Sequence, residues 1–277
     1  FIGLPKELSI VLTTTMLTNP YAGLIILAST DIPDGLSVAQ STILASFMLF
    51  AHALPIEAAI SRQAGTKASF IVVLRVGAAI LYCFLLHQIF AYFHLFAGAA
   101  SVSLPEFSAT PTLPIWAFNQ VKGLVFIQVV IITLLVALEI LKNLQIDRLI
   151  NYIMRPLLKR IGIGDSALTI VVVGLTLGLG FGGGLMIKDV KSGSVKQTDA
   201  IGALVLINLF HSVIEDTSLV MLLGPSLFFV LFVRLIFSLI IAFIVISILK
   251  VIPDELRQKL SVNMNCFTEF IGPSIVK

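Results

Sequence analysis

The chain has 277 residues, of which 58% are hydrophobic and 12% are charged, and its mean hydropathy is +1.06. This composition excludes an ordinary soluble domain and is typical of an integral membrane protein. The net charge of +3 does not indicate nucleic-acid binding, because the Lys and Arg residues lie in short loops, where they set membrane orientation. Cys83 lies in an apolar segment and Cys266 near the end of the chain, so the cysteines predict no disulfide framework.

Apolar stretches of about twenty residues recur along the chain, and each is long enough to cross roughly 30 Å of hydrocarbon as a helix. They lie at approximately residues 8–29, 41–61, 68–96, 119–141, 166–187, 199–223 and 226–249. The sequence therefore predicts an all-α integral membrane protein. Because the first residue is Phe1 rather than Met, we expect the natural sequence to begin upstream.

The distribution of basic residues predicts which loops face the cytoplasm. No Lys or Arg occurs between Arg75 and Lys122, so the Pro-rich loop at residues 99–118 is expected on the external side. The next apolar segment then runs inward. The basic stretch that follows it, residues 143–165, is therefore expected in the cytoplasm. The spacing of Leu and Ile residues in this stretch predicts an amphipathic interfacial helix. The predicted location is the plasma membrane, the inner membrane of a bacterium, with the C-terminus also cytoplasmic.

The segment at residues 166–187 has basic residues at both ends, which predicts that it enters and leaves the membrane on the same side. Two arms of about ten residues would each rise about 15 Å, half the hydrocarbon core. A glycine cluster between residues 178 and 184 supplies the turn, with Gly180, Gly182 and Gly183 at its tip. We interpret the segment as a re-entrant hairpin. The alternative is a Gly-rich packing helix that crosses completely.

The first apolar segment matches this one. Leu8–Val11 corresponds to Leu168–Val171, and the first segment is interrupted at Asn19 and Pro20 instead of at glycines. Equivalent loops of the two segments differ in their content of basic residues. The loop after the first predicted hairpin has no Lys or Arg, whereas the loop after the second has three lysines, so the two are expected on opposite sides of the membrane. The pattern predicts an inverted-topology repeat of hairpin, helix and helix, with five full crossings, two re-entrant hairpins and a pseudo-two-fold axis in the membrane plane.

This organisation divides the chain into six predicted parts. They are repeat one at residues 1–98, an external loop at 99–118, a connecting transmembrane helix at 119–142, a cytoplasmic amphipathic segment at 143–165, repeat two at 166–250 and a cytoplasmic tail at 251–277.

Ionisable residues recur at a constant offset inside the two predicted repeats. His52, Glu57, Gly65 and Arg75 reappear in the same order and with the same spacing as His211, Asp216, Gly224 and Arg234. Each charge costs at least about 2.5 kcal/mol within the membrane unless it is paired or hydrated, so such residues are usually functional. We expect Pro55 to open the first helix, and His211 and Glu215 to share one helical face. The predicted substrate- or ion-binding residues are His52, Glu57, Asn208, His211, Glu215, Asp216 and Thr217, with Arg75 and Arg234 as charge partners.

Three interpretations of this cluster remain open. In a coupling site, the carboxylates and freed carbonyls hold Na⁺ or take a proton, and histidine relays protons. In a metal site, the histidines and carboxylates bind a divalent ion such as Fe²⁺, Mn²⁺ or Zn²⁺, and we weigh this below the coupling site. In a purely structural arrangement, Arg and acid form buried pairs that fix packing.

The local sequence Gly182-Gly-Gly-Leu-Met-Ile187, followed by Gly202–Asn208 and His211–Thr217, resembles the nucleoside-recognition or gate domain group of membrane proteins. The hairpin and inverted-repeat pattern resembles the concentrative nucleoside transporters. The resemblance implies transport between hairpin tips and unwound helices, often in homo-oligomers. The tips Thr18–Tyr21 and Gly178–Gly182 lack the Gln, Thr and Glu signature of true nucleoside transporters, which argues against a nucleoside as the substrate.

We therefore predict a secondary transporter that moves a small polar or anionic solute or ion by alternating access at a midplane site, coupled to a proton or cation. The alternatives are a non-transporting gate or assembly subunit of a membrane complex, and a divalent-metal transporter. No sequence signature of a hydrolase, a metalloprotease or a phosphate-binding loop occurs, so an enzyme is not expected.

Overall fold

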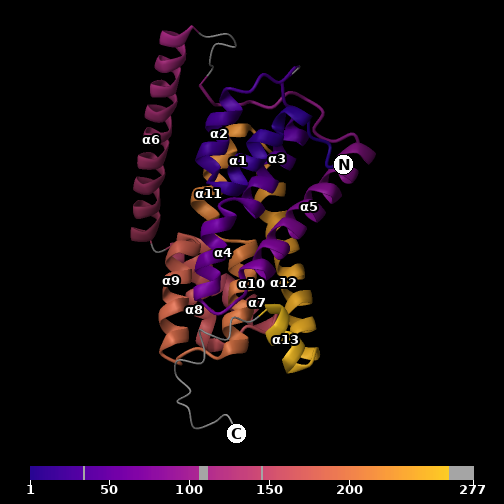
Figure 1. The fold of residues 1–277 in the computed structure, drawn as a ribbon, viewed down its shortest axis with the longest axis vertical. Helices are drawn as coiled ribbons and strands as arrows, with labels where there is room; N and C mark the ends of the chain where they lie inside the picture. Colours follow the sequence, from indigo (N-terminus) through magenta and orange to yellow (C-terminus); the bar gives the residue numbers. More distant parts are fainter. Residues whose placement is uncertain (34, 106–111, 145, 262–277) are drawn as a thin grey trace. The chain divides into compact units, whose positions relative to one another are not determined.

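The computed structural model describes residues 1–33, 35–105, 112–144 and 146–261, and this part of the chain is helical with no β-strand (Figure 1). Five helical stretches are long and apolar enough to cross a membrane: Val38–Gln63, Ala68–Tyr92, Leu113–Ala137, Thr198–Leu223 and Phe228–Val251. The predicted all-α class is thus confirmed. Parts of the predicted external loop and C-terminal tail, residues 106–111 and 262–277, lie outside the described residues.

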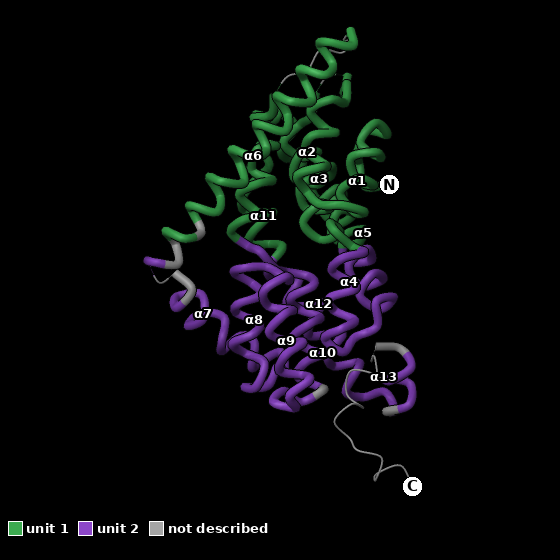
Figure 2. Tube along the Cα trace, turned by 60° about the vertical axis from the view of Figure 1, so that its left-hand side comes forward, with its two compact units in different colours: residues 1–54, 79–141, 214–234 green, residues 55–78, 142–213, 235–277 purple. Residues whose placement is uncertain are grey.

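The chain forms two compact units, and each takes segments from both predicted repeats (Figure 2). Unit 1 comprises residues 1–54, 79–141 and 214–234, and unit 2 comprises residues 55–78, 142–213 and 235–277. The described helices are α1 Ser9–Leu17, α2 Pro20–Ala28, α3 Val38–Ala51, α4 Leu54–Gln63, α5 Ala68–Tyr92, α6 Leu113–Asn143, α7 Ile146–Arg160, α8 Asp165–Leu177, α9 Leu179–Lys191, α10 Gln197–Leu209, α11 Val213–Val220, α12 Arg234–Val251 and α13 Asp254–Ser261.

Unit 1 begins with two short antiparallel helices, α1 and α2, that pack on each other. Asn19 lies at the break between α1 and α2. Its side-chain oxygen caps α2 by accepting a hydrogen bond from the amide of Ala22 at 2.9 Å. Pro20 occupies the first position of α2, where a missing N–H costs nothing. The predicted break at Asn19 and Pro20 is therefore present.

The core of unit 1 joins this helix pair to α3 and to the segment around α11. Its buried apolar side chains are Leu8, Val11, Leu24, Leu27, Leu36, Leu44, Ala45, Met48, Leu49, Leu219, Val220, Leu223 and Val230. The helix α3 starts with a reciprocal cap in which the Ser37 hydroxyl and the Gln40 side chain each bond the other's backbone amide. Burial of these side chains fixes the short helices, which would be marginal alone.

Unit 2 contains a matching pair, α8 and α9, packed against α10, with α7 lying on α8. The chain turns between α8 and α9 at Gly178, whose φ of 88° is readily adopted only by glycine. This break lies before the predicted tip glycines, because Gly180, Gly182 and Gly183 lie within α9.

Close helix packing explains why one of those glycines is needed. A Cβ atom at Gly182 would lie 2.5 Å from the Cα atom of Gly174 on the neighbouring helix α8. A Cβ at Gly180 would meet nothing within 4 Å. Gly182 therefore permits α8 and α9 to approach, and the turn is made by Gly178.

Replacement of Gly182 by alanine is expected to destabilise unit 2, because the new methyl group would force α9 away from the backbone of α8. Overpacking of this kind typically costs about 1–3 kcal/mol. Thermal unfolding of the purified protein in detergent measures the effect, with Gly180→Ala as the matched control on the same helix. An equal unfolding temperature for the two variants would contradict this account of the packing.

Candidate functional site

The apolar spans that contain the predicted site residues are interrupted at equivalent positions of the two predicted repeats. Between α3 and α4 the backbone takes a φ of 49° at Ala53, and before α11 it takes a φ of 47° at Ser212. Such a conformation at a residue other than glycine costs about 1–3 kcal/mol and clusters at functional sites. The amide of Ala53 donates to the Thr15 carbonyl at 3.0 Å, and the amide of Ser212 donates to the Gly174 carbonyl at 3.3 Å. Each interruption is thus held by a neighbouring short helix.

These interruptions differ in two ways from the sequence expectations. The first falls at Ala53, before Pro55, and the second occurs without any proline, so proline is not the common cause. The expectation that His211 and Glu215 share a helical face is wrong, because the backbone between them is not helical at Ser212. The shared feature is the hydrogen bond that each break makes to a short helix.

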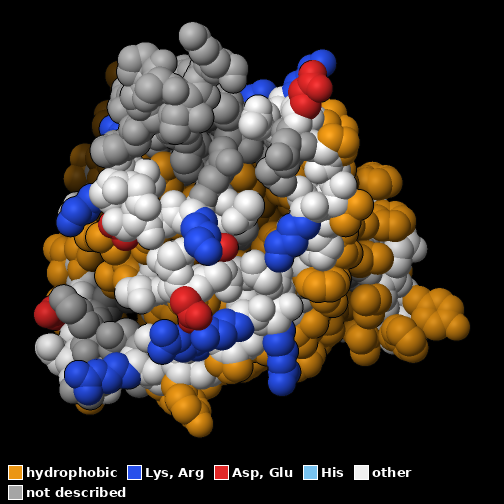
Figure 3. All heavy atoms as spheres, turned by 90° about the horizontal axis from the view of Figure 1, so that it is seen from below, with side chains coloured by type: hydrophobic (Ala, Val, Ile, Leu, Met, Phe, Trp, Pro, Cys, Tyr) orange, Lys and Arg blue, Asp and Glu red, His pale blue; other side chains and the backbone are white. Residues whose placement is uncertain are grey.

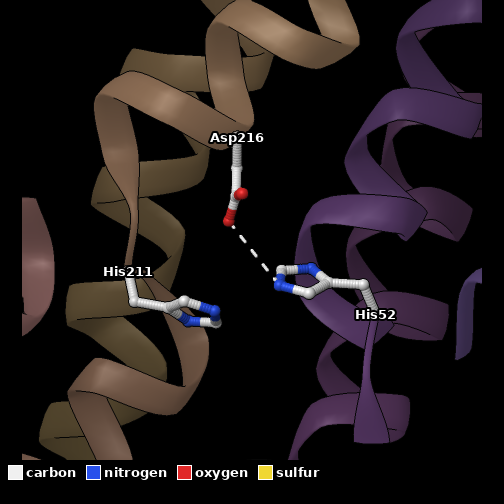
Figure 4. Close-up of side chains that lie close together, drawn as sticks. All are labelled: His52, His211 and Asp216. Carbon is white, nitrogen blue, oxygen red and sulfur yellow. Dashed lines mark ion pairs between the residues drawn. The ribbon is translucent and has the colours of Figure 1, made fainter. Parts of the chain in front are cut away.

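His52 lies at the first interruption and faces Asp216 of α11 within unit 1 (Figure 4). Its Nδ1 atom lies 2.9 Å from the Met48 carbonyl oxygen, and its Nε2 atom lies 3.6 Å from Oδ2 of Asp216. Both side chains are buried, at 4% and 7% exposed. Segments from the two halves of the sequence therefore meet in one His–acid pair.

His211 forms the corresponding pair in unit 2. Its Nδ1 atom lies 2.8 Å from the Ile207 carbonyl oxygen, and its Nε2 atom lies 3.1 Å from Oε1 of Glu57. The guanidinium of Arg75 contacts the other carboxylate oxygen of Glu57. The histidine of each predicted repeat is therefore paired with the acid of the other repeat.

The hydrogen-bond geometry determines where these pairs need a proton. A backbone carbonyl only accepts hydrogen bonds, so Nδ1 of His52 and of His211 must carry the ring hydrogen. A neutral ring would then present the lone pair of Nε2 to a carboxylate oxygen. Two acceptors repel each other unless a proton or a cation lies between them. Each pair therefore avoids this repulsion only when it holds one added proton, or a cation in its place, and the protonated pair has no net charge.

Tyr21 is a site residue that the sequence did not predict. Its hydroxyl donates a hydrogen bond to Oε1 of Glu215 at 2.7 Å within unit 1. Its position directly after the break at Asn19 and Pro20 was a usable signal, since a polar side chain beside a helix break in an apolar segment needs a hydrogen-bond partner when it is buried. The positions equivalent to Tyr21 and Glu215 in the other repeat are Gly180 and Ile56, neither of which has an ionisable side chain.

Arg234 is almost fully buried in unit 1, at 1% exposed. Its guanidinium carbon lies 5.9 Å from the centre of the Phe50 ring, a cation–π distance, and its charge interacts with that of Asp216. Arg75 and Glu57 form the predicted pair by direct contact. Arg234 and Asp216 interact through the attraction of their charges.

Two further predicted residues present unused polar atoms. The amide nitrogen of Asn208 donates to Ser61 at 2.9 Å and to the Leu204 carbonyl at 2.8 Å in unit 2. Among the described residues, Oδ1 of Asn208 and Oγ1 of Thr217 have no hydrogen-bond partner, although both side chains are buried. A buried acceptor without a partner is costly, so these atoms are available to a ligand.

The structure therefore sorts the predicted residues into two sets. Unit 1 brings together His52, Glu215 and Asp216 with Tyr21 and Arg234, and unit 2 brings together Glu57, His211 and Arg75. That the two sets face one cavity remains a prediction, and a divalent-metal site remains the less favoured alternative to a coupling site.

These features define a multi-pass, all-helical membrane protein with buried His–acid pairs. No family model and no solved structure matches the chain. It is similar to the uncharacterized membrane protein YvoD of Bacillus subtilis (strain 168), with 26% identity over 235 residues that cover 84% of this chain and 74% of that protein.

Replacement of Arg75 by alanine is expected to destabilise the fold strongly, because the buried Glu57 carboxylate loses its fixed positive partner. Loss of one member of a buried ion pair costs about 3–5 kcal/mol. The unfolding temperature in detergent reports the effect, and Arg62→Ala, which removes an exposed arginine of the same unit, is the control. A change no larger than that of the control would show that Glu57 does not depend on Arg75.

Proposed function

We propose that this protein is a secondary transporter that couples proton movement to a small polar or anionic solute at a site within the membrane. The observation that carries the proposal is the pair of histidines whose Nε2 atoms face buried carboxylates while their Nδ1 atoms are committed to carbonyls. Such a pair binds and releases a proton as one unit, which a packing role does not require.

Charge balance favours unit 1 as the place of proton coupling. When the His52–Asp216 pair holds its proton, the remaining charges are those of Arg234 and Glu215, which cancel. When the proton leaves, the cluster carries one net negative charge, and its burial disfavours that state unless another cation arrives. Because of the additional carboxylate of Glu215, the cluster is electrically neutral only when the His52–Asp216 pair holds its proton. Na⁺ in place of the proton meets the same requirement.

Unit 2 has the opposite balance. When the His211–Glu57 pair holds its proton, the addition of Arg75 gives the three groups one net positive charge. A buried cluster with net positive charge attracts an anion. This balance supports an anionic solute, and the unused Oδ1 of Asn208 offers a hydrogen-bond acceptor for a polar group on it.

The proposed framework is the inverted-topology repeat with re-entrant hairpins α1–α2 and α8–α9, as in the nucleoside-recognition or gate domain group. This framework is supported by backbone geometry that recurs at the same sequence offset as the ionisable residues. Ala53 and Ser212 are both strained, and Gly65 and Gly224 both have positive φ values. The amides of both strained residues donate to carbonyls that are themselves separated by this same offset. A repeated device of this kind is typical of transporters with alternating access.

The distribution of basic residues supports the proposed orientation. All but three of the 18 Lys and Arg residues belong to unit 2, the exceptions being Lys6, Lys122 and Arg234. Several of them lie in the last turns of α4, α7, α9, α12 and α13, and the face shown in Figure 3 carries several basic side chains. Because cytoplasmic loops are enriched in Lys and Arg, we place the loops of unit 2 in the cytoplasm of a bacterial cell.

A cysteine-labelling experiment tests the second hairpin. Ser166 and Ser194 are exposed at the start of α8 and after α9, and each is replaced by cysteine in a Cys266→Ser background, since the native Cys83 is buried. A membrane-impermeant maleimide should label both positions from the cytoplasmic side only. Labelling from opposite sides would show that α8 and α9 together cross the membrane.

The transport proposal is tested with the purified protein in proteoliposomes that enclose a pH-sensitive dye. Nucleosides, small carboxylates and divalent cations are added one class at a time. Movement of protons that depends on one class identifies the coupled solute, and carboxylates are expected to give the largest signal because of the charge on unit 2. If no class moves protons or accumulates, and the protein instead co-purifies with a stable partner, the chain is a gate or assembly subunit.

Glu215→Gln is expected to reduce proton-coupled transport at least tenfold without unfolding the protein. The glutamine keeps the shape and can still accept a hydrogen bond from Tyr21, but the negative charge that balances a loaded proton is lost. Glu139→Gln, an exposed carboxylate on α6, is the control for charge removal. A fully active Glu215→Gln/Asp216→Asn double variant would overturn the assignment.

A further inference from the structure

Helix α7 has two faces of different character. Met154 and Leu158 are buried where α7 packs on α8 in unit 2. The opposite face exposes Leu149, Tyr152 and Ile153 at 54%, 82% and 48%. These residues are three and four positions apart, so they form one continuous apolar stripe along the helix. A stripe of this kind on a structured helix requires a cover other than water.

Basic side chains lie beside this stripe. Arg148 and Arg155 are exposed, and Lys159 reaches the N-terminus of α8, where its ammonium lies 2.7 Å from a carboxylate oxygen of Asp165. An open hollow of about 660 Å³ is lined by Arg148, Asn151, Tyr152, Ile153, Arg155, Pro156 and Lys159. The hollow thus combines several cations with two hydrogen-bonding side chains and an apolar floor, a combination that suits a phosphate group attached to an apolar tail.

The position of α7 in the chain brings it to the membrane surface. In the sequence, the apolar run of α6 ends at Leu141, Lys142 and Asn143 close the helix, and α7 begins at Ile146. A basic and a polar residue directly after an apolar run mark the boundary of the hydrocarbon core. The first turn of α7 therefore starts at headgroup depth.

We propose that α7 is a binding site for anionic phospholipid, with the lipid phosphate in the basic hollow and the apolar stripe at the boundary of the acyl chains. A second copy of the chain fits this face poorly, because two such faces would bring like charges together. Zwitterionic lipid satisfies the apolar stripe but offers no net negative charge to a hollow lined by three basic side chains. The site is separate from the His–acid pairs and does not depend on transport.

The experiment uses the whole purified protein in detergent, titrated with phosphatidylglycerol or with phosphatidylcholine of the same acyl length. Bound lipid is counted by native mass spectrometry, and the unfolding temperature is measured in parallel. The wild-type protein should bind phosphatidylglycerol at least tenfold more tightly than phosphatidylcholine. Inorganic phosphate at equal concentration should not compete, because it lacks the apolar part.

Arg148→Gln/Arg155→Gln should weaken phosphatidylglycerol binding by about 25-fold, since each basic residue near a membrane surface contributes about fivefold. The matched control is Lys188→Gln/Lys191→Gln, which removes the same charge from exposed positions elsewhere in unit 2 and should change binding less than threefold. Leu149→Ser/Ile153→Ser should weaken both lipids equally. Equal affinity for the two lipids, equal loss in the lysine control, or competition by inorganic phosphate would each overturn the proposal, and so would self-association through this face detected by crosslinking at Tyr152→Cys.

Discussion

The cost of placing charge inside hydrocarbon is the constraint on which the rest of this structure depends. Glu57, Asp216, Arg75 and Arg234 all lie in candidate membrane spans and are all buried. A charge in that environment is tolerated only when a partner or a proton compensates it. Arg75 compensates Glu57 directly. In unit 1, Arg234 supplies one positive charge for two carboxylates, Glu215 and Asp216, so a proton on His52 or another cation is needed to balance the second. The pairs therefore contribute to the structure, and the proposed proton coupling would act through them.

The strained backbone at Ala53 and Ser212 positions these pairs. Each residue follows a histidine at the interruption of a span, and its amide is held by the carbonyl of a short helix. The strain of about 1–3 kcal/mol at each position is offset by this hydrogen bond and by the packing of the short helix. If the short helix moves, the interruption loses its anchor. This connection gives a physical route by which a movement of α1 or of α8 would change the surroundings of a His–acid pair.

Much of this arrangement could be predicted from the sequence. The helical class followed from apolar length, and the ionisable residues of the site followed from their recurrence at a constant offset. The partners of those residues could not be predicted, because spacing within one copy does not indicate that His52 meets Asp216 and His211 meets Glu57 in the other copy. His211 and Glu215 do not share a helical face, because the backbone at Ser212 has a positive φ that is held by a tertiary hydrogen bond and that nothing in the local sequence marks. Gly178 is one of several nearby glycines in the sequence. The structure distinguishes their roles, because Gly178 has the positive φ of the turn and Gly182 packs against Gly174.

The central claim is that Nδ1 of both site histidines is fixed by a carbonyl and that Nε2 shares a proton with a carboxylate. Solid-state ¹⁵N spectroscopy of histidine-labelled protein in lipid measures it directly, with His87 and His94 replaced by glutamine so that only His52 and His211 remain. The account predicts a protonated Nδ1 in both residues at neutral pH, together with either a protonated Nε2 or a protonated partner carboxyl. A bare Nδ1 with the hydrogen on Nε2 of a neutral ring would contradict it.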